Sequence, residues 1–343
     1  MKKKVLEVKN LETSFFTHLG EVQAVRGISF ELNEGDVLGI VGESGSGKSV
    51  SSLSIMKLIE EPGRIKNGTV LFYEEDGNVV DFTKLNQREM NEYRGNDIAM
   101  IFQDPMTSLN PVYRIENQMV EVIRKHMDLD KKEALDRAKL LLEQVGIPDP
   151  EGQIHDYPHQ FSGGMRQRAM IATAISCSPR LLIADEPTTA LDVTIQAQIL
   201  ELLRKLQEDT KMSIILITHD LGVIAEVSTH VIVMYGGMVM ERGTVHDIFY
   251  NPVHPYTQGL HESIPESAAK SKDRLVPIAG SPPDLMDPPK GCPFSPRCPY
   301  TMEVCLQQPS PLLKVSDSQE SSCWLLHKDA PKDPVYQAKR EAK

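Results

Sequence analysis

The sequence predicts an α/β fold with a largely parallel sheet, and three observations support this prediction. Five short apolar runs in the first 250 residues are rich in Val, Ile and Leu, which is typical of strands that are buried on both faces. Two longer segments between these runs carry apolar residues at helical spacing. After about residue 250 the chain becomes rich in proline, so we expect a large α/β domain over residues 1–255 and a C-terminal extension over residues 256–343.

The expected elements follow one another along the chain. The predicted strands are VLGIV, which ends at Val41, and then IAMIF (98–102), LLIAD (181–185), SIILIT (213–218) and HVIVMY (230–235). The predicted helices are KKEALDRAKLLLEQVG (131–146) and TIQAQILELLRKLQEDT (194–210). Gly146 suits the position just after a helix end, because glycine adopts the left-handed conformation found there without strain.

The C-terminal extension has a different character. Ten prolines fall between Pro277 and Pro311. Proline fixes φ and lacks a backbone N–H, so this stretch is predicted to be loop-rich, without a regular helix or a central strand. Something other than a strand ladder must then hold its shape. The final residues, KDAPKDPVYQAKREAK, are polar and are expected to fray.

The composition excludes some classes of function. A net charge of -11 argues against a general nucleic-acid-binding protein, which usually presents a basic face. No apolar run approaches the ~18 residues that cross a bilayer. The segment MKKKVLEVKN is basic but lacks the apolar core of a signal peptide, so we expect a cytoplasmic protein. Cysteines stay reduced in that compartment, which favours metal binding over disulfides at a cysteine cluster.

A glycine-rich motif predicts a phosphate-binding loop. GESGSGKS, Gly42–Ser49, matches G-x-x-x-x-G-K-[ST] and stands between a predicted strand and the helical stretch SVSSLSIMKLIE, as the motif requires. The glycines let backbone N–H groups converge on phosphate oxygens at the positive end of a helix dipole. Lys48 is expected to reach the β- and γ-phosphates, and Ser49 to offer its hydroxyl to Mg²⁺. The alternative, a glycine-rich turn with a chance lysine, is disfavoured by the strand and the helix on either side.

Two carboxylates end a later strand. LLIADE, Leu181–Glu186, places Asp185 and Glu186 at the C-terminal edge of a buried strand, where open α/β sheets bind their ligands. Asp185 is expected to hold Mg²⁺ through water, and Glu186 to act as general base on the attacking water. Acidic strand ends are common, so this motif alone is a weak indication of a nucleotide site. Together with the phosphate-binding loop it is a strong one.

These motifs resemble those of the ATP-binding-cassette (ABC) ATPases. The segment FSGGMRQR, Phe161–Arg168, is similar to the signature motif of that family and comes just before LLIADE, as in the family. Further matches, all in the family's order, are Phe15 (or its neighbour Phe16) for the aromatic that stacks on adenine, Gln103 for the Q-loop, Thr189-Ala190-Leu191-Asp192 for the D-loop and His219 for the switch histidine. Each match alone has a structural explanation, but together they keep one order across some 250 residues.

The resemblance implies a fold and a site. The fold is a RecA-like core with an antiparallel β subdomain and a helical subdomain at about residues 104–165, followed by a small loop-rich metal-binding region. The residues implied in nucleotide binding are Phe15, Gly42, Ser44, Gly45, Ser46, Gly47, Lys48, Ser49 and Val50. Those implied in catalysis are Lys48, Gln103, Glu186 and His219, and those implied in Mg²⁺ binding are Ser49, Gln103 and Asp185.

The resemblance also implies a head-to-tail dimer. ATP on the loop of one subunit would be completed by Ser162, Gly163 and Gly164 of the other, while Asp192 crosses the interface. ATP would hold the dimer together, and hydrolysis would release it. The segment DPMTSLNPVYRI, which follows Gln103, resembles the stretch that receives coupling helices from membrane subunits.

Longer segments point to one group of importers. The D-type ATPases of oligopeptide and dipeptide importers resemble this chain in GESGSGKSVSSLSIMKLI, IFQDPMTSLNPVYRIENQM, EPTTALDVTIQAQIL, NPVHPYTQGLHESIP and IAGSPPDLMDPPKGCPFSPRCPY. The resemblance implies four partners, namely a second, F-type ATPase, two transmembrane permease subunits and an extracytoplasmic peptide-binding protein, with no nucleic acid. It places the chain on the inner face of the cell membrane. Nickel and glutathione importers belong to the same group, so these cargoes stay open.

Four cysteines gather near the C-terminus, at Cys292, Cys298, Cys305 and Cys323. Their spacing contains no C-x₂-C pair and fits neither a zinc ribbon nor a bacterial ferredoxin run. A proline-rich segment without ladders needs a cross-link, and a Cys₄ metal site would supply it. The resemblance implies a [4Fe–4S] cluster at these positions, with Zn²⁺ or no metal as the alternatives. Cys177 is expected to be a small buried apolar residue.

Three other functions compete with this interpretation. A cassette ATPase that acts on nucleic acid usually carries two cassettes or large insertions, and this chain has one cassette. A non-catalytic scaffold is opposed by the intact Lys48, Asp185, Glu186 and His219. An exporter is usually fused to transmembrane helices. The sequence therefore favours an ATP-hydrolysing importer subunit.

Overall fold

The computed structural model describes residues 3–104, 108–189, 191–263, 278–331 and 336. The chain divides into two compact units. The first comprises Met1–Val5, Leu32–Asp36 and Tyr73–Ile217, and the second comprises Leu6–Glu31, Val37–Phe72 and Thr218–Lys343. The second unit thus combines N-terminal segments with the C-terminal extension, and the domain boundary expected at residue 255 stays a prediction.

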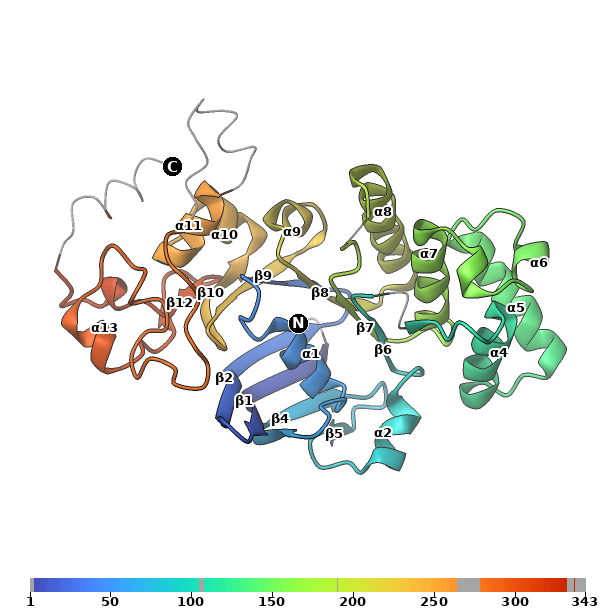
Figure 1. Cartoon of the computed structure of the whole chain (residues 1–343), viewed down its shortest axis with the longest axis horizontal. Helices are drawn as coiled ribbons and strands as arrows, with labels where there is room; N and C mark the ends of the chain where they lie inside the picture. Colours follow the sequence, from blue (N-terminus) through green and yellow to red (C-terminus); the bar gives the residue numbers. More distant parts are fainter. Residues whose placement is uncertain (1–2, 105–107, 190, 264–277, 332–335, 337–343) are drawn as a thin grey trace. The chain divides into compact units, whose positions relative to one another are not determined.

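Three parallel strands pair with one another in the first unit. These are β6 (Ile98–Ile101), β7 (Leu181–Asp185) and β8 (Ser213–Thr218), in the order β8-β7-β6 (Figure 1). Leu181 pairs with Ile98 on one side and with Ser213 on the other. Every residue of the three strands is buried, so the prediction of parallel strands buried on both faces is confirmed.

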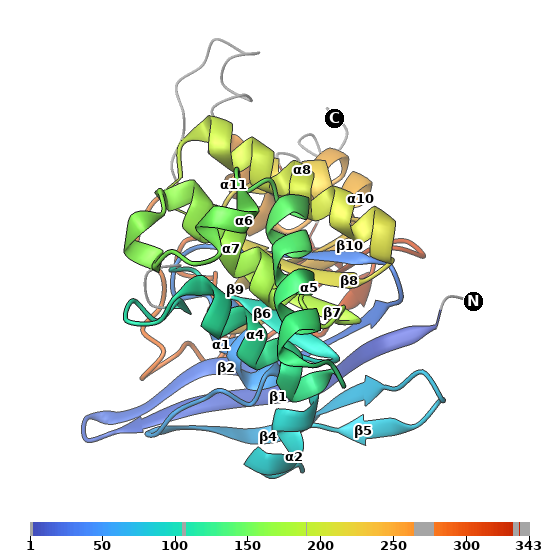
Figure 2. The same cartoon turned by 90° about the vertical axis from the view of Figure 1, so that its right-hand side faces the viewer.

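Helices accompany these strands in the first unit. They are α2 (Gln87–Tyr93), α4 (Ile115–His126), α5 (Lys131–Gln144), α6 (Pro150–Gln153), α7 (Gly163–Ala174) and α8 (Val193–Thr210), together with a 3₁₀ turn (Pro158–Gln160) and a short strand, β5 (Val79–Asp81). Helix α5 packs against α4, α6 and α7 (Figure 2). The range expected for the helical subdomain therefore does contain packed helices.

Capping residues mark the start of both predicted helices, and a glycine marks the end of the first. At the start of α5, Asp130 accepts hydrogen bonds from two backbone N–H groups of the first turn, and Glu133 accepts one from the backbone of Asp130, which completes a capping box. Gly146 follows this helix with φ 77°, as predicted. Helix α8 begins one residue before its predicted start, because Asp192 accepts a hydrogen bond from the backbone N–H of Ile195.

The second unit contains an antiparallel sheet. Its strands β1 (Lys4–Thr17), β2 (Gly20–Asn33) and β4 (Gly63–Tyr73) lie in the order β2-β1-β4, with Val8 of β1 opposite Val70 of β4. Leu6, Val8 and Leu11 of β1 are all fully buried or nearly so. This sheet confirms the antiparallel β subdomain that the resemblance implies.

A second set of paired strands in this unit joins segments from both ends of the chain. Strand β3 (Val37–Val41) is parallel to β9 (His230–Tyr235), which is antiparallel to β10 (Met238–Thr244). Two short strands of the extension, β12 (Glu320–Ser321) and β11 (Leu313–Lys314), continue it in the order β11-β12-β10-β9-β3. The expectation that no ladder holds the extension is therefore wrong just beyond Pro311, where the residues again have backbone N–H groups to donate.

The helices of the second unit are short. They are α1 (Lys48–Ile55), α9 (Leu221–Val227), α10 (Val245–Tyr250), α11 (Pro255–Glu262) and α13 (Glu303–Gln307), with a 3₁₀ turn at Trp324–Leu326. The prediction of a proline-rich stretch without a helix is wrong for α13, because Pro299 and Pro309 leave enough residues between them for a single turn. Among the residues that the structure describes, no helix is long and apolar enough to cross a membrane.

A buried carboxylate ties β10 to the C-terminal extension. Glu241 is fully buried and accepts hydrogen bonds from the backbone N–H groups of Val253 (2.9 Å) and His254 (2.9 Å) and from Gln319 Nε2 (2.8 Å). Burial raises the pKa of Glu241, and these donors counteract the rise. Burial also lowers the pKa of His254 to about 3, so its neutral ring accepts a hydrogen bond from the backbone N–H of Tyr256.

We predict that Glu241→Ala destabilises the second unit. The change leaves the buried backbone N–H groups of Val253 and His254 without their acceptor, at a cost of roughly 2–4 kcal/mol. The urea midpoint of unfolding, followed by the fluorescence of Trp324, should fall. The exposed Glu226 on α9 is a matched control, and Glu226→Ala should leave the midpoint unchanged. Equal midpoints for the two variants would show that other contacts hold the extension.

Candidate functional site

The glycine-rich motif forms the turn between β3 and α1 in the second unit. Its first glycine, Gly42, has φ 155°, and a Cβ there would stand 2.1 Å from the carbonyl oxygen of Met234. Gly47 has φ 98°, and a Cβ there would stand 2.4 Å from the carbonyl oxygen of Ala24. Only glycine fits either position, because the backbone of β2 and β9 lies too close for a side chain. The predicted strand-loop-helix context is therefore confirmed.

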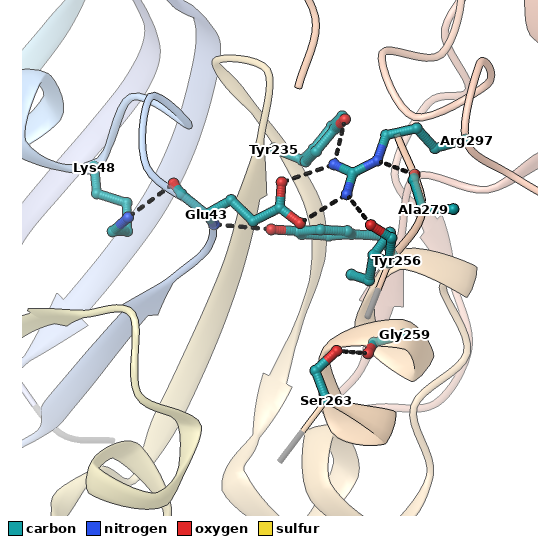
Figure 3. Close-up of polar contacts among 9 residues, drawn as sticks. Glu43, Lys48, Tyr235, Tyr256, Gly259, Ser263, Ala279 and Arg297 are labelled. Atoms are coloured by element: carbon teal, nitrogen blue, oxygen red, sulfur yellow. Dashed lines mark hydrogen bonds and ion pairs between the residues drawn. The ribbon is translucent and has the colours of Figure 1, made fainter. Parts of the chain in front are cut away.

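Lys48 lies at the start of α1 and turns back over this loop. Its side chain is buried, and Nζ donates hydrogen bonds to the carbonyl oxygens of Gly42 (2.7 Å) and Glu43 (3.1 Å; Figure 3). The ammonium group thus lies at the mouth of the turn, where the backbone N–H groups at the helix start also concentrate positive potential. This arrangement suits an anionic ligand such as a phosphate group.

The other residues predicted for this loop differ in exposure. Ser44 and Gly45 are exposed, Ser46 is buried, and Ser49 and Val50 are half-buried. A buried hydrogen bond of 2.8 Å between Thr13 Oγ1 and Ser54 Oγ holds α1 against β1. The loop therefore has a fixed base and an open outer edge.

The two aromatic candidates lie next to each other on β1. Phe15 is half-buried and packs against Gly63 of β4, where an added Cβ would stand 2.7 Å from its ring. Phe16 carries the guanidinium of Arg64 over its ring, 4.1 Å from the centroid. Phe16 already has this stacking partner, so Phe15 remains our choice for the adenine contact.

The two carboxylates that the sequence predicts for the site lie at the end of β7 in the first unit. Asp185 is buried as the last residue of the strand. The next residue, Glu186, accepts hydrogen bonds at Oε2 from Gln103 Nε2 (3.1 Å) and Thr189 Oγ1 (2.8 Å). The structure thus brings Gln103 and Glu186 together, although the two residues are far apart in the sequence. Sequence reasoning assigned Thr189 only to the D-loop and missed its contact with Glu186.

The backbone of Glu186 is strained. Its φ is 47°, in the left-handed region that a residue with a long side chain seldom adopts. Its N–H donates a hydrogen bond to the carbonyl oxygen of Ile217 on β8 (2.8 Å), which anchors the strained residue to the next strand. Strain of this kind concentrates at functional sites, where the surrounding structure holds a side chain in one direction. Sequence patterns gave no signal for it.

The signature segment begins helix α7. Ser162 is its N-cap and accepts a hydrogen bond from the backbone N–H of Met165 (3.3 Å), and both Ser162 and Gly163 are exposed. Farther along the helix, the buried Gln167 donates a hydrogen bond to the carbonyl oxygen of Pro187 (2.6 Å). The signature helix is thereby linked to the residue that follows Glu186, a connection that sequence reasoning missed.

The remaining predicted residues are exposed at the starts of helices. Asp192 is the N-cap of α8, and His219 is the residue before Asp220, the N-cap of α9. His219 and the phosphate-binding loop belong to the second unit, whereas Asp192 and Glu186 belong to the first. Ala190 of the D-loop, and residues 105–107 of the segment expected to receive coupling helices, lie outside the described residues.

The four C-terminal cysteines line one cavity in the second unit. The cavity measures about 20 Å³, and its walls also include His254, Phe294 and Trp324. All five cysteines of the chain carry free thiols, and Cys177 is buried, as predicted. Burial raises the pKa of Cys292 to about 11 and also raises the pKa of Cys298 and Cys323, so these thiols are held in the protonated form.

The predicted [4Fe–4S] cluster is not supported by this arrangement. In residues 3–104, 108–189, 191–263, 278–331 and 336, no group of three or more His, Cys, Asp or Glu side chains is placed to hold a metal ion. The donor chemistry fits, since four thiols face one cavity, but a cavity of about 20 Å³ has room for about one water molecule. The structure therefore brings the four thiols to one cavity but gives no support for a cluster among them.

Comparison with known proteins finds relatives for both parts of the chain. Residues 25–189 match the model of the ABC transporter family, and residues 240–305 match that of the oligopeptide/dipeptide transporter C-terminal region. The chain is 54% identical over 330 residues to the oligopeptide transport ATP-binding protein OppD of Bacillus subtilis, which covers 96% of this chain and 91% of that protein. It is 52% identical to the dipeptide transport ATP-binding protein DppD of Lactococcus lactis subsp. cremoris, with 96% and 93% covered.

Solved structures resemble the cassette part of the chain. One is a dimeric ATP-binding cassette in a post-hydrolysis state bound to ADP and phosphate, with 25% identity and a TM-score of 0.62 over 70% of this chain and 98% of that chain. Another is CbiO1 of Clostridium perfringens, part of an ABC transporter complex, with 26% identity and a TM-score of 0.59 over 72% of this chain and 91% of that chain. Both agree with the fold class predicted from the sequence.

Proposed function

This chain belongs to the ABC transporter family, within the oligopeptide and dipeptide transport ATP-binding proteins, and on that premise we propose that it hydrolyses ATP to drive peptide uptake. The observation that supports peptides as the cargo is the match of residues 240–305 to the oligopeptide/dipeptide transporter C-terminal region. These residues lie beyond the part of the chain that matches the ABC transporter model. The relatives reported above handle peptides by name, which favours peptides over nickel or glutathione.

The phosphate-binding loop is proposed to hold the nucleotide. Backbone N–H groups of Gly42–Ser49 would bind the phosphates, and Lys48 would exchange its bonds to the loop carbonyl oxygens for the β- and γ-phosphate oxygens. Phe15 would stack on adenine. Mg²⁺, held by Ser49, Gln103 and Asp185, would neutralise charge on the phosphates when bound. The buried ammonium of Lys48 supports this assignment.

Glu186 is proposed to be the general base. Its carboxylate would accept a proton from the attacking water, while His219 orients that water and the γ-phosphate. Two hydrogen bonds, from Gln103 and Thr189, hold the carboxylate of Glu186 in one direction, and the strained backbone restricts it further.

The signature and D-loop residues are proposed to act on the ATP of a partner subunit. Ser162, Gly163 and Asp192 are exposed, as an interface between subunits requires before assembly. The proposed partner is a second, F-type ATPase, and the pair would work beneath two permease subunits supplied by a peptide-binding protein. This assembly places the chain on the inner face of the cell membrane.

The four cysteines are proposed to bind a metal, with a [4Fe–4S] cluster as the first choice and Zn²⁺ as the alternative. Support for the proposal is the approach of Cys292, Cys298, Cys305 and Cys323 to one cavity. Thiolates are the ligands that both metals prefer, so metal binding would have to displace the thiol protons that burial retains.

We predict that Glu186→Gln keeps ATP binding and loses hydrolysis. Glutamine preserves the shape of the side chain but cannot take a proton, so phosphate release by the purified chain at saturating MgATP should fall about 100-fold or more. The equilibrium affinity for ATP should stay near that of the wild type. Glu208→Gln, at an exposed position on α8, should change neither quantity. Hydrolysis at the wild-type rate by Glu186→Gln would contradict the assignment of the base.

The metal proposal predicts a definite metal content in protein purified without oxygen. A cluster should give about four irons and four sulfides per chain with a broad brown absorbance, and Cys298→Ser should remove all three. Cys177→Ser, which alters a cysteine outside the cavity, should leave them unchanged. Stoichiometric zinc without colour would support the alternative, and protein free of both metals would contradict metal binding.

A further inference from the structure

An ion pair joins the cysteine segment to the phosphate-binding loop. The guanidinium of Arg297, the residue before Cys298, meets both carboxylate oxygens of Glu43, the second residue of the loop (Figure 3). The distances are 2.7 Å from Nη1 to Oε2 and 3.1 Å from Nη2 to Oε1. The two residues are 254 positions apart in the sequence, and both belong to the second unit. Arg297 did not appear in the site predicted from the sequence, and Glu43 appeared there only as a position of the Gly42–Ser49 motif without a role of its own.

Arg297 is held in place independently of Glu43. Its Nε donates a hydrogen bond to the carbonyl oxygen of Ala279 (2.9 Å), Nη2 donates to that of Ile278 (3.0 Å), and Nη1 donates to the hydroxyl of Tyr235 (2.9 Å). The side chain is only 6% exposed. The planar fork of an arginine can make these contacts together with a two-bond ion pair, whereas a lysine cannot. The cysteine segment therefore presents a positive charge to the loop in a fixed position.

Glu43 is also part of the structure of the loop. Its backbone N–H donates a hydrogen bond to the hydroxyl of Tyr256 on α11 (2.9 Å), and its carbonyl oxygen accepts one from Lys48 Nζ (3.1 Å; Figure 3). The carboxylate of Glu43 is therefore attached to the same short backbone that would bind the phosphates. A negative charge at this point would repel a phosphorylated ligand unless it were compensated.

We propose that Arg297 is a positioning residue for nucleotide binding: its ion pair cancels the charge of Glu43 beside the phosphate-binding loop. This inference rests on the proposed nucleotide binding at Gly42–Ser49 and adds a residue of the C-terminal extension to it. Arg297 acts through Glu43 and does not touch the nucleotide. Arg297 could instead only fasten the extension to the cassette. In that case the charge of Glu43 would not matter, and removing it would not restore ATP binding to an Arg297→Gln variant.

The test is a charge cycle on the full chain with ATP and Mg²⁺. Arg297→Gln exposes the carboxylate of Glu43 and should weaken ATP binding roughly tenfold, because an uncompensated charge close to a charged ligand has an effect of that order. Adding Glu43→Gln to that variant removes the repulsion and should restore most of the affinity. The loss should be larger for ATP than for ADP, and it should shrink in about 0.5 M KCl, which screens charge.

A second pair of variants keeps Arg297 in place. Glu43→Asp shortens the side chain, so the carboxylate stays near the loop but loses its two-bond contact, whereas Glu43→Gln removes the charge. We expect Glu43→Asp to bind ATP about threefold or more weakly than Glu43→Gln, since only the former leaves a poorly compensated charge. This comparison remains valid even if Arg297→Gln does not fold.

Two results would overturn the inference. One is a double variant, Arg297→Gln with Glu43→Gln, that binds ATP as weakly as Arg297→Gln alone. Arg297 would then only fasten the extension to the cassette. The other is equal ATP affinity for Glu43→Asp and Glu43→Gln. Failure of the wild-type chain itself to bind ATP would instead contradict the proposed function, because that outcome does not depend on Arg297.

Discussion

The second unit depends on the close approach of three backbone segments around the phosphate-binding loop. Gly42 lies against the carbonyl oxygen of Met234, and Gly47 lies against that of Ala24, so the loop closes only because these two residues have no side chain. The backbone N–H of Gly237 then donates a hydrogen bond to the carbonyl oxygen of Ser46 (3.1 Å). The turn between β9 and β10 thus supports the phosphate-binding loop, as does strand β3, which precedes the loop in the sequence.

The same turn receives the C-terminal extension. Gly236 leaves so little space that a Cβ there would stand 2.8 Å from Pro293, and Tyr235 packs its ring against Phe294 at a centroid distance of 5.4 Å. Arg297 reaches past this turn to Glu43. The extension, which begins far from the loop in the sequence, therefore contributes to the walls that hold it. Phe294 also lines the cysteine cavity, so packed side chains connect this cavity with the turn that supports the phosphate-binding loop.

Local patterns were sufficient for much of the fold and for the motif residues. Buried strands such as β7 and β8, the end of α5 at Gly146, and the strand-loop-helix around Lys48 all follow from apolar spacing and glycine chemistry. What the sequence could not reveal were contacts between distant segments, namely the Arg297–Glu43 pair and the two strands that the extension adds to the sheet. The cysteine spacing alone matched no metal-site pattern, so the prediction that the thiols meet rested on the proline-rich context and the resemblance, and the structure does bring all four to one cavity.

The central claim is that ATP at the Gly42–Ser49 loop drives peptide uptake. The most direct measurement is transport of a labelled peptide into vesicles that contain the permease subunits, the peptide-binding protein, the partner ATPase and this chain. The account predicts uptake with ATP and none above background when this chain carries Lys48→Ala. Uptake at the wild-type rate with Lys48→Ala would contradict it, because transport would then not require nucleotide at this loop.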